Sequence, residues 1–128
     1  DVYAHSALAY MLLRKGEDER ALRWFSSATK FGGAQSYNDL AWLLATSKIT
    51  ELRNGELSLQ HALKAVDLAA SAAYLDTLAA AYAESGLFAD ALLTQEQAIA
   101  AAFAEDEGVK QELELHLLSY QKQQPWRE

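Results

Sequence analysis

Cysteine is absent from this sequence, which excludes disulfides, iron–sulfur clusters and thiol catalysis. Only 1 proline and 6 glycines occur among 128 residues, so the chain is neither collagen-like nor of low complexity. Valine, isoleucine and threonine together number 10, against 25 alanines and 21 leucines. Because alanine and leucine favour helices whereas β-branched residues favour strands, this balance predicts an all-α fold.

No apolar run approaches the roughly 18 residues of a transmembrane helix, so we expect no direct membrane insertion of this chain. Basic residues are scarce in the second half. Residues 65–128 hold 3 Lys/Arg against 11 Asp/Glu, a balance of −8, whereas residues 1–64 hold 8 against 7, a balance of +1. An acidic half repels phosphate groups, which argues against nucleic acid and anionic membranes as partners.

The hydrophobic fraction of 51% is enough for one core, and we expect a single domain over residues 1–128. Asp1 is not a natural initiator residue, so we expect the sequence to be a fragment of a longer chain. The compartment, cytoplasm or periplasm, stays open because a fragment need not carry the targeting segment.

Glycines divide the chain into pieces of helical length, and between them apolar residues recur at intervals of three and four. Helices are predicted over residues 2–15, 18–31, 35–47, 56–70, 72–85, 88–103 and 107–122. Most connections are short, which predicts antiparallel neighbours, but residues 47–55 form a longer loop with an Asn-Gly turn signal. Pro125 is expected to end the ordered part, with residues 126–128 trailing after it.

The sequence shows an internal repeat when it is aligned with itself at an offset of 70 residues. The identical pairs are Leu8 with Leu78, Ala9 with Ala79, Gly16 with Gly86, Ala21 with Ala91, Leu22 with Leu92 and Ala28 with Ala98. An offset of 70 residues is two units of about 34 residues with two residues added, which the middle unit and its long loop would contain.

This pattern resembles the tetratricopeptide repeat (TPR), a helix–turn–helix unit of about 34 residues. The matching units are residues 2–35, 36–71 and 72–105, and residues 107–122 resemble a C-terminal capping helix. The resemblance implies an α-solenoid in which small residues lie where paired helices approach closest. Those positions are Ala9, Ala79, Ala91 and Ala98, with Leu78, Tyr82 and Phe25 filling the space between them.

The chain departs from the family pattern at two places. The larger aromatic residue of the second helix is replaced by Gln95 in the third unit and by Ala62 in the second, so the packing there should be looser or differently filled. The proline that often ends a unit is missing throughout. Residues 40–46, 52–55 and the ending 125–128 resemble bacterial TPR proteins, in many of which the repeats form the soluble part of a larger, often membrane-anchored, protein.

The resemblance also implies a concave groove, lined by the first helix of each unit, that binds a peptide. Carried over position by position, the groove residues are Tyr3, Ser6, Tyr10, Arg14, Asn38, Trp42, Asp76 and Glu84. Tyr10 and Trp42 lie off the core positions of the repeat, and aromatic side chains in a groove are favoured binding anchors. The alternative for Trp42 is that it packs against the loop 47–55.

Some TPR proteins hold acidic chaperone tails with a clamp of basic and amide side chains. The matching positions here are Ser6, Tyr10, Asp39, Ala73 and Thr77, and none is basic. Without cations such a clamp cannot pair with a terminal carboxylate, so a co-chaperone function is excluded.

Catalytic and metal-binding residues are not expected. His5, His61 and His116 fall on separate predicted helices and are interpreted as packing or solvated residues. Residues 105–107 are acidic at a predicted helix start, where carboxylates suit the helix dipole without any bound cation. Ser26 and Ser27 have no His or Asp at a fixed near spacing. No enzyme activity and no cofactor are therefore predicted.

These observations predict a non-enzymatic module that binds an apolar or basic segment of a protein in the groove. The alternative is a structural or oligomerisation module at the C-terminal end of a larger bacterial protein, in which case self-association is expected.

Overall fold

The computed structural model describes residues 2–128, and within them the chain is entirely helical. The seven α-helices are α1 (Val2–Arg14), α2 (Asp18–Ala28), α3 (Ala34–Thr46), α4 (Gly55–Leu68), α5 (Ala72–Glu84), α6 (Phe88–Ala101) and α7 (Glu107–Gln121). One short 3-10 helix, Thr29–Phe31, follows α2, and another, Thr50–Leu52, lies in the long loop between α3 and α4. The all-α prediction is confirmed.

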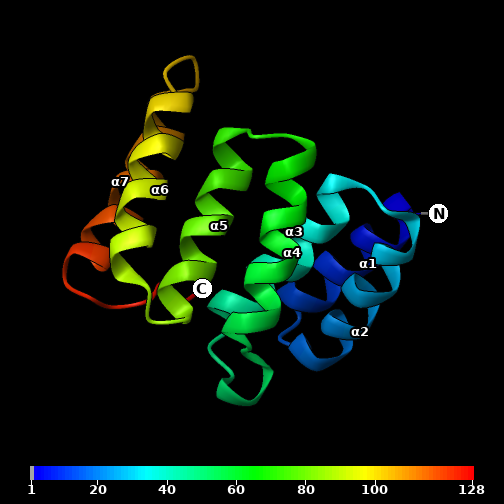
Figure 1. The fold of residues 1–128 in the computed structure, drawn as a ribbon. Helices are drawn as coiled ribbons and strands as arrows, with labels where there is room; N and C mark the ends of the chain where they lie inside the picture. The colour runs from blue at the N-terminus through cyan, green and yellow to red at the C-terminus, as the bar shows by residue number, and fades with distance from the viewer. Residues whose placement is uncertain (1) are drawn as a thin grey trace.

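The helices form three antiparallel pairs, followed by α7 (Figure 1). The most extensive contacts join α1 with α2, α3 with α4 and α5 with α6, and α7 packs on α6. Successive pairs also touch, because α3 contacts both α1 and α5 while α4 contacts α5. The helix pairs therefore stack side by side in the order of the chain.

The turns after α1 and α5 have the same backbone geometry, 70 residues apart. Gly16 and Gly86 both have φ of +78°, a left-handed conformation that favours glycine. The amide of Glu17 donates to the carbonyl of Leu12 at 2.8 Å, and that of Leu87 donates to Tyr82 at 2.9 Å. Each turn thus ends its helix with the hydrogen bonds of a Schellman motif.

Alanine occupies fully buried positions between the helices. Ala9, Ala79, Ala91 and Ala98 are all fully buried, as the repeat pattern predicts. Leu78 and Phe25 are buried beside them, and Tyr82 is half-buried. A side chain without a γ-carbon lets two helix backbones approach, so these positions determine how tightly the pairs pack.

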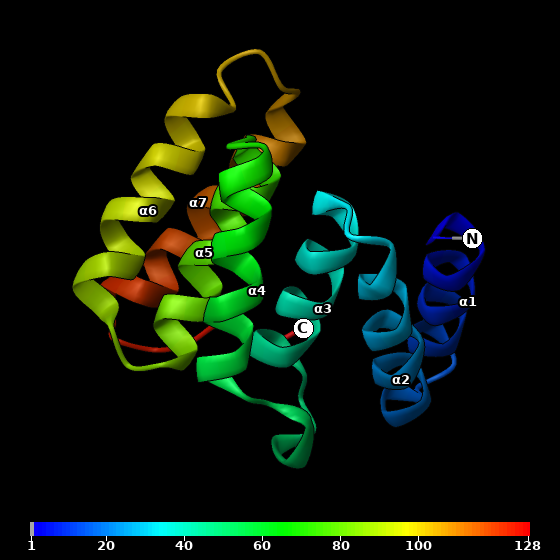
Figure 2. The same ribbon diagram turned by 45° about the vertical axis from the view of Figure 1, so that its right-hand side comes forward.

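The C-terminal residues fold back onto the helices instead of trailing, so this part of the prediction is wrong. The helix α7 ends at a left-handed Gln123 (φ 57°), which reverses the chain. The following segment passes beneath α5 and ends beside α3 (Figure 2), where the amide of Glu128 donates to the carbonyl of Thr46 at 2.8 Å. The surfaces that hold residues 125–128, here called the C-terminal segment, come from helices far away in sequence.

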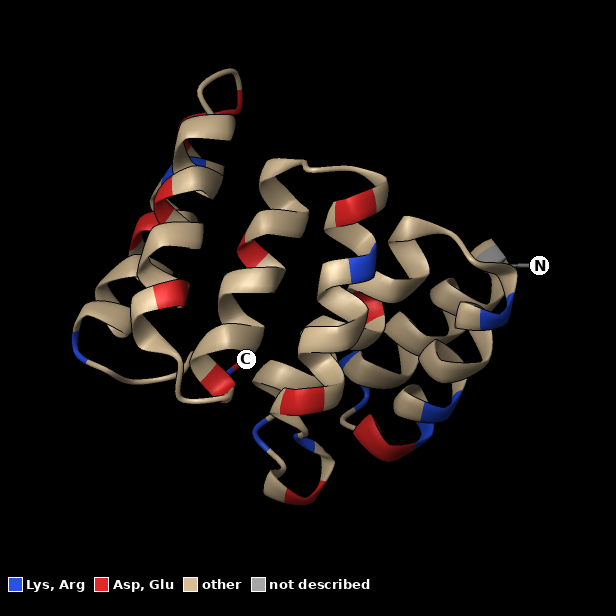
Figure 3. Cartoon of the chain, in the orientation of Figure 1, with Lys and Arg blue, Asp and Glu red and all other residues tan. Residues whose placement is uncertain are grey.

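Charge is unevenly distributed along the molecule (Figure 3): 8 of the 11 basic residues belong to residues 1–64, whereas acidic residues gather toward α5, α6 and α7. Among the described helices, none has the length and apolar character to cross a membrane.

Candidate binding site between α1, α3 and the C-terminal segment

A hydrogen-bonded chain of side chains links the first helices of the three pairs. Tyr10 of α1 donates its hydroxyl to Oδ1 of Asp39 on α3, and Gln35 Nε2 donates to the same oxygen at 2.7 Å. Tyr74 of α5 donates to Gln35 Oε1 at 3.1 Å. The face formed by α1, α3 and α5 is therefore joined by polar contacts as well as by apolar packing.

Burial changes the acidity of the two central groups. Asp39 is 3% exposed, and the loss of solvent raises its pKa above the ordinary value, although hydrogen bonds from Tyr10 and Gln35 and the nearby hydroxyl of Ser6 oppose the change. The pKa of Tyr10 is also raised, first by burial and then by its hydrogen bond to Asp39. Tyr10 therefore stays protonated, as its role as the donor requires.

A pocket of about 290 Å³ opens beside Tyr10 and Asp39, and we call it the Trp42 pocket. It is lined by Tyr10, Leu13, Asp18, Phe25, Asp39, Trp42, Leu43, Thr46, Ser47 and Glu128. These residues come from α1, α2, α3 and the C-terminal segment, so four parts of the chain converge there. Its volume lies near the lower end of the range for small-molecule sites, about 300 Å³.

A second, shallower pocket lies on the other side of the Tyr10–Asp39 pair. It measures about 620 Å³ and is lined by Tyr3, Ser6, Tyr10, Gly33, Ala34, Gln35, Ser36, Asp39 and Tyr74. Tyr10 and Asp39 thus line both pockets.

A buried polar cluster of side chains from α5, α6 and α7 packs against Trp42. His116 of α7 is 2% exposed, and its Nδ1 lies 2.7 Å from Oδ1 of Asp76 on α5. Gln95 of α6, which is fully buried, donates its Nε2 to Asp76 and to the carbonyl of Leu113, each at 2.9 Å. At the position where the repeat pattern lacks its aromatic residue, the space is therefore filled by a hydrogen-bonding amide.

Two tryptophans enclose His116. Its ring centroid lies 5.6 Å from that of Trp42 and 4.4 Å from that of Trp126 in the C-terminal segment. Burial lowers the pKa of His116, but the hydrogen bond and charge of Asp76, with the charges of Glu112 and Glu128, outweigh it and raise the pKa overall. Because the imidazole is almost inaccessible to solvent, the geometry suits a structural role better than proton transfer to a substrate.

The C-terminal segment is held by an acidic residue of α5. Glu84 pairs with Arg127 at 2.7 Å and with Arg53 of the α3–α4 loop at 3.2 Å. Arg127 also donates to the carbonyl of Ala45 at 3.4 Å. One carboxylate therefore fastens both irregular segments to the end of the same helix.

Of the eight predicted groove residues, four line the two pockets described above, two are engaged in other contacts and two do neither. Tyr10 and Trp42 line the Trp42 pocket, and Tyr3 and Ser6 join Tyr10 at the second pocket. Asp76 and Glu84 are committed to His116, Gln95 and the two arginines. The remaining two residues line neither pocket: Asn38 is half-buried on α3, and Arg14 is exposed at the end of α1.

Asp18, Asp39 and Glu128 line the pocket but were not among the predicted groove residues, although Asp39 matches a position of the family's clamp. Asp39 lies four residues after Gln35 and three before Trp42, so helical spacing could have placed all three on one face. Nothing in the sequence brings Asp18 or Glu128 to the same pocket, because each reaches it through tertiary packing. The ring of Trp42 packs against His116, a contact that the sequence analysis did not predict.

The other two histidines pack on aromatic rings: His5 lies against Trp24 and Phe31, and His61 stacks on Tyr37. The acidic residues 105–107 include Asp106, which caps α7 by accepting from the amide of Val109 at 2.9 Å. Among residues 2–128, no group of three His, Asp or Glu side chains is arranged to hold a metal ion.

No protein-family profile matches the sequence, and no curated protein matches it either.

Proposed function

We propose that this chain is a TPR-type solenoid of three helix pairs and a capping helix, and that it acts as a non-enzymatic module for binding proteins. Two features support the proposed register: the identical turns at Gly16 and Gly86, and the full burial of alanine at equivalent positions of the first and third pairs. In this proposal residues 2–35, 36–71 and 72–105 are the repeats.

The observation that carries the proposal is the convergence of two aromatic anchors on one pocket. Tyr10 from α1 and Trp42 from α3 both line the Trp42 pocket, and Tyr10 remains 42% exposed. Rigid aromatic side chains at the edge of a partly dehydrated pocket provide large contact areas at small entropic cost. A partner segment would place apolar side chains against these rings.

The test is selection from a phage-displayed library of random peptides, followed by calorimetry with the selected peptides. The Trp42→Ala and Tyr10→Phe variants separate the two anchors: the first removes a ring, and the second keeps the ring but removes the hydroxyl. We expect Trp42→Ala to weaken binding by roughly 2 kcal/mol or more, and Tyr10→Phe to weaken it much less.

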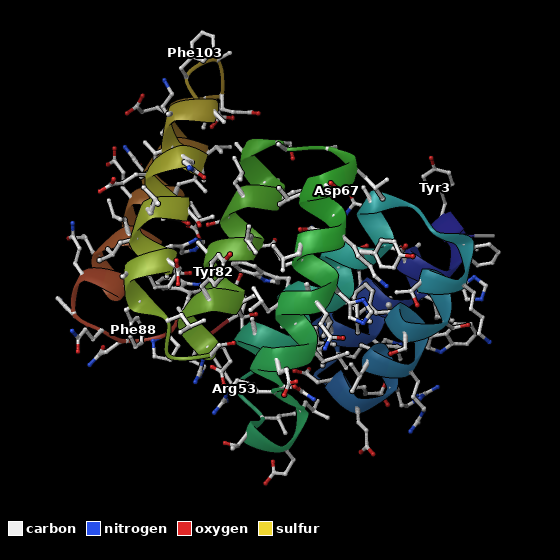
Figure 4. All side chains as sticks on the ribbon, viewed as in Figure 1. Tyr3, Arg53, Asp67, Tyr82, Phe88 and Phe103 are labelled. Atoms are coloured by element: carbon white, nitrogen blue, oxygen red, sulfur yellow. The ribbon has the colours of Figure 1, made fainter. Side chains whose placement is uncertain are left out.

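Phe103→Ala is the matched control. Phe103 is 80% exposed and projects from the loop after α6, away from the helices (Figure 4), so its loss should leave peptide binding unchanged. Circular dichroism verifies the fold of each variant. If the selected peptides bind Trp42→Ala with the affinity of the wild type, the pocket is not the binding site.

A structural or oligomerisation module is the second candidate, supported by apolar side chains at the α6–α7 end of the molecule. Leu93 of α6 and Leu115 and Leu118 of α7 are each at least half exposed. Leucines on an outer helix face are suited to contact with another protein surface, including a second copy of this chain.

A further inference from the structure

The Trp42 pocket has an excess of negative charge. Asp18, Asp39 and Glu128 supply three carboxylates, and none of the described residues that line the pocket is Lys, Arg or His. Two basic side chains that lie close in sequence to these carboxylates are engaged elsewhere: Arg127 pairs with Glu84, and Arg20 pairs with Glu17. The carboxylates at this pocket therefore have no cation of the described chain among them.

Asp39 provides a second, independent indication of a missing ligand. Asp39 is only 3% exposed, and it forms part of the pocket wall. Oδ1 accepts from Tyr10 and Gln35, but Oδ2 is buried and, within residues 2–128, no group meets hydrogen-bond geometry with it. An ionised carboxylate with an unsatisfied oxygen in a low-dielectric site is stabilised by a nearby positive charge.

The pocket also has the aromatic surfaces that an organic cation prefers. Tyr10, Phe25 and Trp42 line it, with the rings of Tyr10 and Phe25 edge to face at a centroid distance of 5.1 Å. The electron-rich face of an aromatic ring attracts an ammonium or guanidinium group, most strongly when water is excluded. Carboxylates and aromatic rings together favour a long side chain with an apolar stem and a cationic end.

We propose that the Trp42 pocket binds the side chain of a Lys or Arg residue of the partner polypeptide, with its stem against Tyr10 and Trp42 and its charge toward Asp18 and Asp39. This inference rests on the proposed protein-binding function and specifies the chemistry that the partner must supply. Glu128 lines the pocket from the C-terminal segment, so that segment belongs to the site.

The test compares two capped pentapeptides, Gly-Gly-Arg-Gly-Gly and the same peptide with citrulline, a neutral isostere of arginine. Their titration into uniformly nitrogen-15-labelled protein is followed through the amide resonances of Tyr10, Asp39 and Thr46 and the indole resonance of Trp42. We expect saturable shifts with the arginine peptide and binding weaker by roughly tenfold or more with citrulline. Added salt should weaken the arginine complex selectively.

Two variants locate the charge. Asp39→Asn keeps an acceptor for Tyr10 and Gln35, and Asp18→Asn keeps an acceptor for Ser47, so both should fold. Each should reduce affinity for the arginine peptide by roughly five- to tenfold. Glu51→Gln, which neutralises an exposed carboxylate outside the pocket, is the matched control and should leave the affinity unchanged.

Equal affinity for the arginine and citrulline peptides, or no saturable shift at Trp42, would overturn the inference. Tighter saturable binding of spermidine at the same resonances would overturn the assignment to a polypeptide side chain. Library peptides that bind through Trp42 without any Lys or Arg would refute the charge recognition while supporting the proposed function. Failure of both the library selection and the arginine titration would overturn both.

Discussion

At the scale of single residues, alanine and histidine have the clearest structural roles. Alanine occupies fully buried positions between the helices, where the atoms of a larger side chain would have to displace their neighbours. His116 lies among Asp76, Trp42 and Trp126, where the surrounding carboxylates favour its charged form. Both residues make the stability of the fold sensitive to small chemical changes at a few positions.

Ala79→Leu is expected to destabilise the protein by about 1–3 kcal/mol, because the added atoms overpack a fully buried contact. The measurement is the free energy of unfolding from urea titration. Ala100→Leu on the exposed side of α6 is the control and should change that value by less than about 0.5 kcal/mol. Unchanged stability of Ala79→Leu would show that the repeat register is wrong.

His116 makes stability depend on pH in a defined direction. Its pKa in the folded protein is raised above the ordinary value of 6.5, so folding favours the protonated form. The stabilisation is therefore fully present below pH 6.5 and is lost as the pH rises through the folded pKa.

The comparison is between the wild type and His116→Gln, each unfolded by urea at several pH values. The difference in free energy of unfolding should be largest in mild acid and should shrink as the pH rises, whereas His61, whose pKa burial lowers, contributes equally to both proteins and cancels. A difference that is independent of pH would contradict the assigned pairing with Asp76.

At the scale of elements, the two irregular segments matter as much as the helices. Arg53 of the α3–α4 loop and Arg127 of the C-terminal segment both pair with Glu84. The reversal at Gln123 directs the chain toward α3. The C-terminal segment thereby connects α7 to the α3 and α5 helices, and it supplies one wall of the Trp42 pocket.

Gln123→Gly is expected to stabilise the protein by about 0.5–1 kcal/mol, because glycine adopts the left-handed conformation without steric cost although it also raises the entropy of the unfolded chain. Gln121→Gly, inside the last turn of α7, is the matched control and should destabilise by about as much. Thermal unfolding measures both changes. Opposite shifts in Tm are expected, and equal losses would contradict the left-handed turn.

Arg127→Met removes the shorter of the two ion pairs of Glu84 and should cost about 1 kcal/mol, since both side chains are partly buried. It should also speed hydrogen exchange at the amide of Glu128, which bonds to Thr46. Arg20→Met breaks an exposed ion pair with Glu17 and should cost less than about 0.5 kcal/mol. Equal exchange at Glu128 in wild type and Arg127→Met would show that the ion pair does not hold the segment.

At the scale of the whole molecule, oligomeric state distinguishes the two proposed functions. A module that presents its pocket to a partner is expected to be a monomer of 14.1 kDa at all concentrations in light scattering. A mass near twice that value that Leu118→Glu reduces to the monomer would favour the oligomerisation module, because Leu118 lies on the exposed face of α7. Leu57→Glu, another exposed leucine on α4, is the control for added charge.

Most of the fold follows from the sequence, because helices depend on local properties. The spacing of apolar residues determines the extent of α1 and α5. The glycines at 16 and 86, which adopt the left-handed conformation, determine where these two helices end. Alanine at positions 70 residues apart predicted the buried contacts of the first and third pairs. Only the helix ends differ by a few residues, where 3-10 turns and capping side chains compete with the α-helical hydrogen bonds.

The site was decided mainly by tertiary structure. The TPR resemblance selected Tyr10 and Trp42 by their positions on the predicted helices, and both side chains line the Trp42 pocket. Which partners an acidic residue finds depends on neighbours that packing supplies. Asp76 contacts His116 and Gln95, and Glu84 pairs with Arg53 and Arg127, whereas Asp18, Asp39 and Glu128 meet at the pocket. The return of residues 125–128 to α3 has the same origin, because its contacts join positions about 80 residues apart and no local pattern encodes them.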